Sequence, residues 1–139
     1  MDLLAERACQ RLVIDYARWL DAGDAERFGA LFSDDAVWDM PGWFRLEGRD
    51  AIVDRMVRPD RPGTSRHLVS NIAIDLVGHD RAVGFACFVN YRNESAVDRP
   101  GPAGEPRFVG RYLDRFDRTD DGWRIAHRRV EVDFEATPQ

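Results

Sequence analysis

The stretch RFVGRYLDRFDRTDDGWRIAHRRVEVDF, residues 107–134, decides the fold. Apolar and polar residues alternate along both of its halves, which is the period of a β-strand with one covered face. Residues 120–122 interrupt the alternation with the Asp-Asp-Gly composition of a tight turn. The stretch therefore predicts two long antiparallel strands, residues 107–118 and 123–134.

Two further strands precede this hairpin. Residues 67–77 and 82–95 show the same strand pattern, and residues 78–80 form the turn between them. A loop rich in proline and glycine, residues 98–106, leads to the next strand. Four long strands in succession predict an antiparallel meander. Strands of this length bend, and a bent sheet covered by a helix encloses a cavity.

The N-terminal part has the pattern of three helices. Leu3–Ala22 places apolar residues three or four positions apart, between a capping Asp and a terminating Gly. Asp24 caps a short second helix. The apolar residues of its buried side are Phe28, Leu31 and Phe32. Residues 50–57 form a third helix, which the dipeptide Arg58-Pro59 ends.

Between the second and third helices, the pattern predicts a turn at residues 33–35, a strand over 36–40 and a second strand over Phe44–Glu47. This order predicts an α+β fold in one domain, residues 1–139. We expect a cone-shaped, curved antiparallel sheet, wrapped by the three N-terminal helices around an internal pocket.

The composition excludes several classes of function. The net charge of −5 is spread along the chain, and no basic block is present to follow nucleic acid. No apolar run approaches membrane-spanning length and no targeting signal opens the chain, so we expect a cytoplasmic protein. All 20 basic residues are arginine, which excludes lysine Schiff-base chemistry and a phosphate-binding loop lysine. The two cysteines and three histidines lack metal-ligand spacing, so we expect neither a metal nor a cofactor.

Strand parity groups the residues that face a cavity. One side of the late strands carries Phe88, Asn90, Phe108, Tyr112, Ala126 and Arg128. Tyr16 and Trp38 add aromatic surface, which is typical of a core as well as of a binding site. An Asn and an Arg among aromatic residues are costly if buried unpaired, so they reach solvent or line a cavity.

The opposite side of the late strands suits packing and a subunit contact. Its residues are Val109, Leu113, Trp123 and Ile125, interleaved with Arg111 and Arg115. We expect a homo-oligomer that covers this face, on which Phe85 also lies.

Asp21 and His67 have two interpretations each from the residues alone. Asp21 lies in the last turn of the first helix, where the helix dipole gives a carboxylate no support, so it needs water or a partner elsewhere. His67 begins a long strand and is either a structural residue or a catalyst.

With these segments in place, the chain resembles the SnoaL-like branch of the nuclear transport factor 2-like superfamily over nearly its whole length. The matching segments are YARWLDAGD at residues 16–24, LFSDDAVW at 31–38, GRDAI at 48–52, Arg66-His67 with Ser70-Asn71, and GWRIAHR at 122–128. The resemblance includes scytalone dehydratase, the bile-acid dehydratase and hexachlorocyclohexane dehydrochlorinase. The lysine of the dehydrochlorinase's helix is replaced here by Tyr16, which disfavours a halide-leaving reaction.

This resemblance implies a cofactor-independent acid–base enzyme with an Asp21–His67 dyad. His67 is then the general base, Asp21 orients it, and Tyr16 polarises a carbonyl or a departing hydroxyl. The expected reaction is that of a dehydratase-type lyase, an isomerase or a cyclase. Its substrate is expected to be a small hydrophobic ring compound of polyketide, steroid or aromatic type. The residues expected to bind it are Trp38, Phe88, Asn90, Phe108, Tyr112 and Arg128.

Two alternatives remain at this point. The segments RHLVSN at 66–71, VNYR at 89–92 and FVG at 108–110 also resemble the small subunits of ring-hydroxylating dioxygenases, which have no catalytic activity of their own. The chain can also be a domain that binds a small molecule without catalysis. The resemblance to the superfamily slightly favours a trimer over a dimer.

Overall fold

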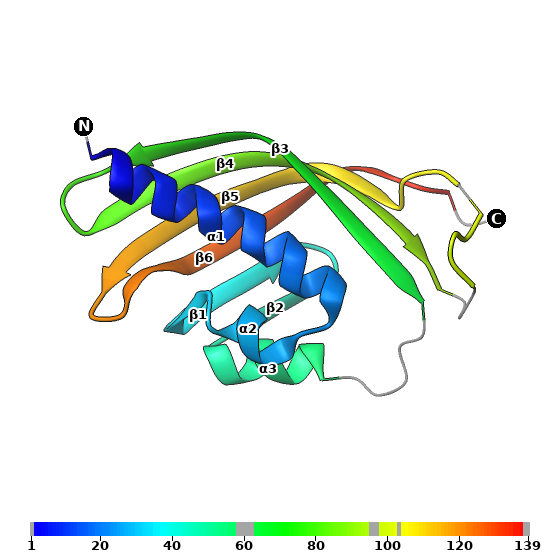
Figure 1. Ribbon diagram of the computed structural model, residues 1–139, viewed down its shortest axis with the longest axis horizontal. Helices are drawn as coiled ribbons and strands as arrows, with labels where there is room; N and C mark the ends of the chain where they lie inside the picture. Colours follow the sequence, from blue (N-terminus) through cyan, green and yellow to red (C-terminus); the bar gives the residue numbers. More distant parts are fainter. Residues whose placement is uncertain (1, 58–62, 95–97, 103, 138–139) are drawn as a thin grey trace.

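The computed structural model describes residues 2–57, 63–94, 98–102 and 104–137 and has an α+β architecture (Figure 1). Its elements are α1 (Leu3–Ala22), α2 (Ala25–Gly29), β1 (Phe32–Met40), β2 (Phe44–Glu47), α3 (Arg49–Met56), β3 (Thr64–Leu76), β4 (Arg81–Asn93), β5 (Phe108–Thr119) and β6 (Gly122–Glu135). The predicted three helices and four long strands are confirmed. The predicted helix end at Arg58-Pro59 and strand end at Ser95 lie outside the described residues.

All six strands belong to one curved sheet in the order β2-β1-β6-β5-β4-β3. The meander from β3 to β6 is antiparallel, as predicted, but β1 runs parallel to β6. The sheet is therefore antiparallel, as predicted, except at this one junction. Hairpin turns fix only the pairing of consecutive strands, and β1 meets β6 after the chain has crossed the whole sheet.

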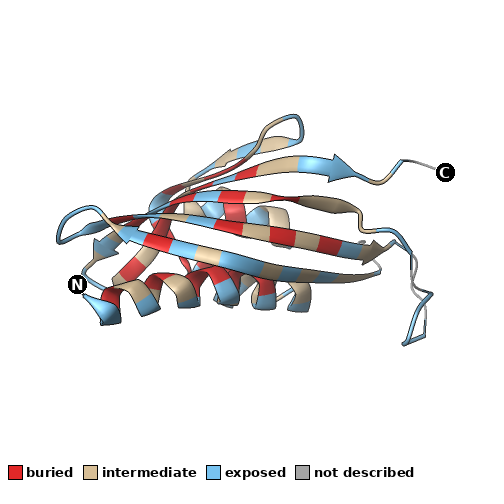
Figure 2. Cartoon of the chain, turned by 90° about the horizontal axis from the view of Figure 1, so that it is seen from above, coloured by how far each residue is buried: buried red, intermediate tan, exposed pale blue. Residues whose placement is uncertain are grey.

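Helix α1 lies along the concave side of the sheet and buries its apolar stripe there (Figures 1 and 2). The buried residues of α1 are Ala5, Cys9, Leu12, Val13, Tyr16 and Ala17. Burial raises the pKa of the Cys9 thiol to about 12, so Cys9 acts as a small apolar core residue. Helices α2 and α3 pack against each other, and α3 also packs against β1.

The predicted turn at residues 33–35 is a bulged segment of β1. The pairing of β1 with β6 shifts between Phe32 and Val37. Asp34 and Asp35 are exposed there, whereas Phe32 and Ala36 on either side are fully buried. Two consecutive polar residues have the composition of a turn, but a β-bulge also exposes polar residues without reversing the chain.

Because of a second bulge, the parity at the start of β6 differs from the prediction. Trp123 and Ile125 were expected on the outer side, yet both are buried in the core. Arg115 pairs with His127, but Phe116 pairs with Ile125, so Ala126 is an extra residue in β6. One extra residue inverts the alternation of the segment before it. The inward side of Phe88, Asn90, Tyr112, Ala126 and Arg128 is otherwise as predicted, and all five are buried.

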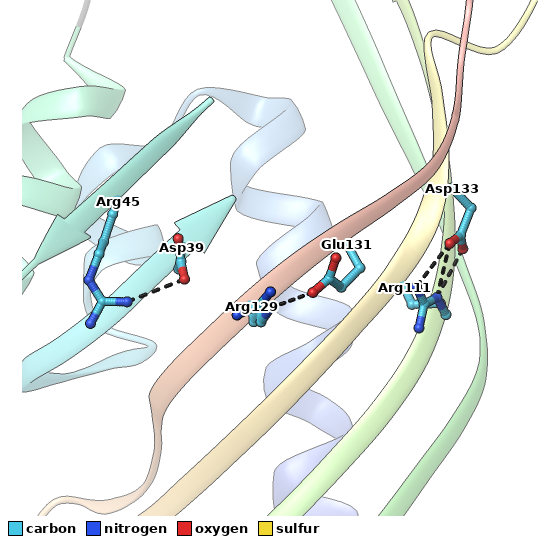
Figure 3. Close-up of polar contacts among 6 residues, drawn as sticks. All are labelled: Asp39, Arg45, Arg111, Arg129, Glu131 and Asp133. Carbon is cyan, nitrogen blue, oxygen red and sulfur yellow. Dashed lines mark hydrogen bonds and ion pairs between the residues drawn. The ribbon is translucent and has the colours of Figure 1, made fainter. Parts of the chain in front are cut away.

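The convex face of the sheet combines apolar and charged side chains. Its exposed apolar residues are Leu68, Val83, Phe85, Tyr91 and Leu113. Figure 3 shows three ion pairs on the sheet, Arg45–Asp39, Arg129–Glu131 and Arg111–Asp133. A broad face with exposed apolar side chains is a candidate for a contact with a second copy of the chain.

We predict that a second copy of the chain covers this face. Wild-type protein should sediment as a dimer or trimer at micromolar concentration, and Leu113→Arg should shift it toward the monomer. Leu4→Arg, on the exposed side of α1, is the matched control and should leave the assembly intact. A wild-type chain that sediments as a monomer would contradict the prediction.

Candidate functional site

The C-cap of α1 fixes the position of Asp21. Gly23 has the left-handed φ of 69°, and its N–H donates to the carbonyl of Leu20. The N–H of Asp24 donates to the carbonyl of Trp19 and completes the cap. The chain turns away directly after Asp21, whose side chain is only 3% exposed.

The carboxylate of Asp21 binds His67 at two points. Its Oδ2 accepts the backbone N–H of His67 at 2.7 Å, and its Oδ1 lies 2.6 Å from the ring Nδ1. The Arg66 guanidinium lies 4.0 Å from Oδ2. The predicted contact between the two side chains is confirmed, and it supplies the partner that Asp21 lacks at a helix C-terminus.

This contact determines which ring nitrogen is available. A carboxylate only accepts hydrogen bonds, so Nδ1 of His67 carries the proton that it donates to Asp21. In neutral imidazole the other nitrogen, Nε2, then has a free lone pair. No residue in the described part of the chain donates a hydrogen bond to Nε2, and His67 lines a cavity. The arrangement is that of an oriented base.

The cavity has a volume of about 490 Å³ and lies between α1, β1, β2, α3 and the inner side of the sheet. Its described lining residues are Tyr16, Leu20, Asp21, Ala22, Gly23, Trp38, Met40, Trp43, Phe44, Arg55, Met56, Gly63, Ser65, His67, Phe88, Asn90, Arg92, Arg99, Arg107, Phe108, Tyr112 and Val130. Every residue predicted for the site lines this cavity except Arg128. A cavity of this volume suits a small organic molecule.

Aromatic rings form the inner end of the cavity. Phe88 stacks on Tyr112 with ring centres 4.5 Å apart and planes 4° from parallel, and Tyr16 meets Tyr112 at 5.3 Å. Gly110 permits this stack, because a Cβ there would lie 2.9 Å from the Phe88 ring and 2.1 Å from the carbonyl of Glu131. Burial raises the pKa of Tyr16, so its hydroxyl keeps its proton and serves as a donor.

Asn90 places an amide beside the dyad. It is the strand partner of His67 and only 4% exposed. Its Nδ2 donates to Oγ of Ser65 at 3.0 Å and to the carbonyl of Arg66 at 3.3 Å. With Nδ2 fixed on β3, the Oδ1 of Asn90 remains an acceptor for a ligand hydroxyl.

Arg128 is not among the residues that line the cavity, so its prediction as a wall residue is wrong. Its Nε and Nη2 bind the two carboxylate oxygens of Asp114 at 2.8 and 2.6 Å, and both side chains are buried. Its guanidinium lies 4.1 Å from the ring centre of Tyr16 and 4.0 Å from that of Tyr112. The ion pair thus supports the two tyrosines from behind. Asp114 could have been paired with Arg128 from sequence, because it shares the inward parity of Tyr112.

The sequence analysis missed the residues around the mouth of the cavity. These are Met40, Trp43, Phe44, Arg55, Met56, Arg92, Arg99 and Arg107. Arg92 continues the parity of Phe88 and Asn90 and could have been found by that signal. Met40, on β1, likewise continues the parity of Trp38. The others lie on β2, on α3 or in loops, where no periodicity indicates which side chains line the cavity.

Comparison with known proteins identifies the family to which the chain belongs. A family model for the SnoaL-like domain matches residues 1–129. The chain belongs to the SnoaL-like domain family. Its fold is that of nuclear transport factor 2-like proteins, as in a cystatin-like example from Novosphingobium aromaticivorans. No curated protein matches the chain at significance.

Several solved structures share the fold over almost the whole chain. A proposed scytalone dehydratase from Novosphingobium aromaticivorans is 23% identical with a TM-score of 0.84, over 99% of this chain and 90% of that one. The type 3 hexachlorocyclohexane dehydrochlorinase LinA from Novosphingobium barchaimii is 19% identical with a TM-score of 0.77, over 97% and 91%. The β subunit of a proposed aromatic-ring-hydroxylating dioxygenase from Novosphingobium aromaticivorans is 21% identical with a TM-score of 0.77, over 98% and 94%. The fold is therefore shared by enzymes and by a dioxygenase β subunit.

We predict that the buried Arg128–Asp114 ion pair next to Tyr16 and Tyr112 contributes to the stability of the fold. Asp114→Asn leaves the Arg128 guanidinium buried without a counter-charge and should cost about 3–5 kcal/mol of unfolding free energy. Urea denaturation measures the loss. Asp133→Asn, which removes the exposed partner of Arg111, is the matched control and should cost little. Equal losses in the two variants would show that the buried pair does not support the fold.

Proposed function

We propose that this SnoaL-like protein is a cofactor-independent acid–base enzyme acting on a ring-containing small molecule. The observation that carries the proposal is the 2.6 Å contact between Asp21 Oδ1 and His67 Nδ1 on the wall of an aromatic cavity. A buried carboxylate that fixes the tautomer of a histidine is a feature of general-base sites. A purely structural histidine does not need a free Nε2 facing a cavity.

In the proposed reaction, Nε2 of His67 removes a proton from a carbon next to a carbonyl group. The C–H electron pair forms a new double bond and the charge moves onto the carbonyl oxygen. In an elimination, the enolate electrons re-form the carbonyl and make a C=C bond as the hydroxyl on the next carbon leaves. This hydroxyl takes the proton from the His67 imidazolium and departs as water, which restores the neutral base. In an isomerisation, the proton returns from His67 to another carbon.

Asp21 and Tyr16 have complementary roles in this scheme. The negative charge of Asp21 stabilises the imidazolium that forms on His67. The hydroxyl of Tyr16 keeps its proton at neutral pH and donates a hydrogen bond to the carbonyl or departing hydroxyl oxygen. The rings of Trp38, Phe88 and Tyr112 exclude water and present flat apolar surface to a ring substrate.

The second candidate function is that of a non-catalytic dioxygenase subunit. The similarity to a dioxygenase β subunit favours it. In that case the dyad is a structural tie between α1 and β3, and the isolated chain has no acid–base activity. If the chain is instead a ligand-binding domain without catalysis, we also expect no turnover, but the chain should still bind ring compounds.

Proton exchange tests the proposal without knowledge of the natural substrate. The chain is incubated with 2-tetralone in D₂O, and loss of the α-proton signals is followed by NMR. We expect exchange above the buffer rate, and His67→Ala should slow it about 10²–10⁴-fold, the usual contribution of a general base. Asp21→Asn should cause a smaller loss, because the imidazole remains without its orienting charge.

The controls distinguish loss of the catalytic base from loss of the fold. His79→Ala, in an exposed turn, should keep the wild-type rate. The wild-type rate should decrease in acid, because only the neutral imidazole accepts a proton. Exchange by His67→Ala at the wild-type rate would refute the mechanism, and no exchange by the folded wild-type chain with any ring ketone would favour the non-catalytic functions.

A further inference from the structure

The cavity is rich in positive charge. Among its described lining residues, Asp21 is the one acid, whereas the arginines are Arg55, Arg92, Arg99 and Arg107. The whole chain has the opposite balance, with 25 acidic and 20 basic residues. Positive charge gathered in a cleft of an acidic protein attracts anions to that cleft.

Three of these arginines lie at one end of the cavity. Arg92 lies near the end of β4 and is paired with Ser65 at the start of β3. Arg107 directly precedes β5, and Arg99 lies in the connection between β4 and β5. These strand ends lie together at one end of the sheet (Figure 1). Arg55, in the last turn of α3, reaches the same cavity.

The guanidinium groups lie against the aromatic walls. Arg107 lies over the ring of Phe108 at 5.2 Å, and Arg55 over that of Phe44 at 3.8 Å. Both rings line the cavity. Glu94 binds both Arg92, at 3.0 Å, and Arg107, which fixes these two side chains beside each other. Arg99 makes no ion pair with any described residue. A flat ligand that packs on these walls therefore brings its edge beside guanidinium donors.

The strand register gives the distance between the arginine end of the cavity and His67. His67 pairs with Asn90, and Ser65 pairs with Arg92. Two residues along a strand span ~7 Å. An anionic group bound by the arginines therefore lies ~7 Å from His67 along the strands, toward the mouth of the cavity. This separation is comparable to the width of a fused two-ring system.

We propose that the cavity selects ring compounds carrying an oxyanion, either a carboxylate or a phosphate ester, which the mouth arginines bind. Guanidinium groups recognise both anions through paired charge-assisted hydrogen bonds. The inference deepens the proposed function, since it takes the same cavity as the substrate site. Binding is measured apart from turnover, so the two proposals can fail independently.

Calorimetric titration with three naphthalene probes tests the inference. The probes are naphthalene-2-carboxylate, 2-naphthyl phosphate and naphthalene-2-carboxamide, at low ionic strength. We expect at least one anion to bind about tenfold more tightly than the carboxamide, which corresponds to ~1.4 kcal/mol. The tighter of the two anions identifies which oxyanion the site takes. The preference should weaken as salt is added.

Matched variants locate the effect. Arg99→Gln and Arg107→Gln should each reduce the preference for the anion about threefold or more, with little effect on the carboxamide. Arg7→Gln, on the exposed side of α1, makes the same change in net charge and should leave the preference intact. Equal affinity for anion and carboxamide, or a preference that survives both mouth substitutions, would overturn the inference.

Discussion

The two-point bond between Asp21 and His67 connects the helical half of the molecule to the edge of the sheet. A carboxylate buried at a helix C-terminus is unfavourable by itself, and here the backbone N–H and ring Nδ1 of one residue satisfy it. Because Asp21 ends α1 and His67 lies near the start of β3, the bond holds the helix across the concave face. The bond lies on the wall of the cavity and orients the base within it.

The cavity then has three levels along the strands. Stacked rings of Phe88 and Tyr112 close the inner end, supported from behind by the Arg128–Asp114 ion pair. His67 and its strand partner Asn90 supply the polar groups of the middle level. Arginines occupy the mouth. One cavity thus offers apolar surface, a base and cationic donors in sequence, which suits a ring compound with a reactive carbon next to a polar end.

Period and order along the chain predicted most of this arrangement. The 3.6-residue period of α1 and the alternation of β4 and β5 gave the inward residues Tyr16, Phe88 and Tyr112. Two bulges were not predictable, because an extra residue such as Ala126 changes the parity without any compositional signal. Arg128 was misplaced for a different reason. Its parity was right, but parity cannot distinguish a side chain facing the cavity from one buried under it beside Asp114.

The tautomer of His67 tests the central claim most directly. Two-dimensional ¹H–¹⁵N NMR of the histidine side chains distinguishes a protonated ring nitrogen from one with a free lone pair. At a pH where the ring is neutral, the account predicts a proton on Nδ1 and a free lone pair on Nε2 of His67. Asp21→Asn should remove this preference. A proton on Nε2 in the wild-type chain, or the same tautomer with and without the Asp21 carboxylate, would contradict the account.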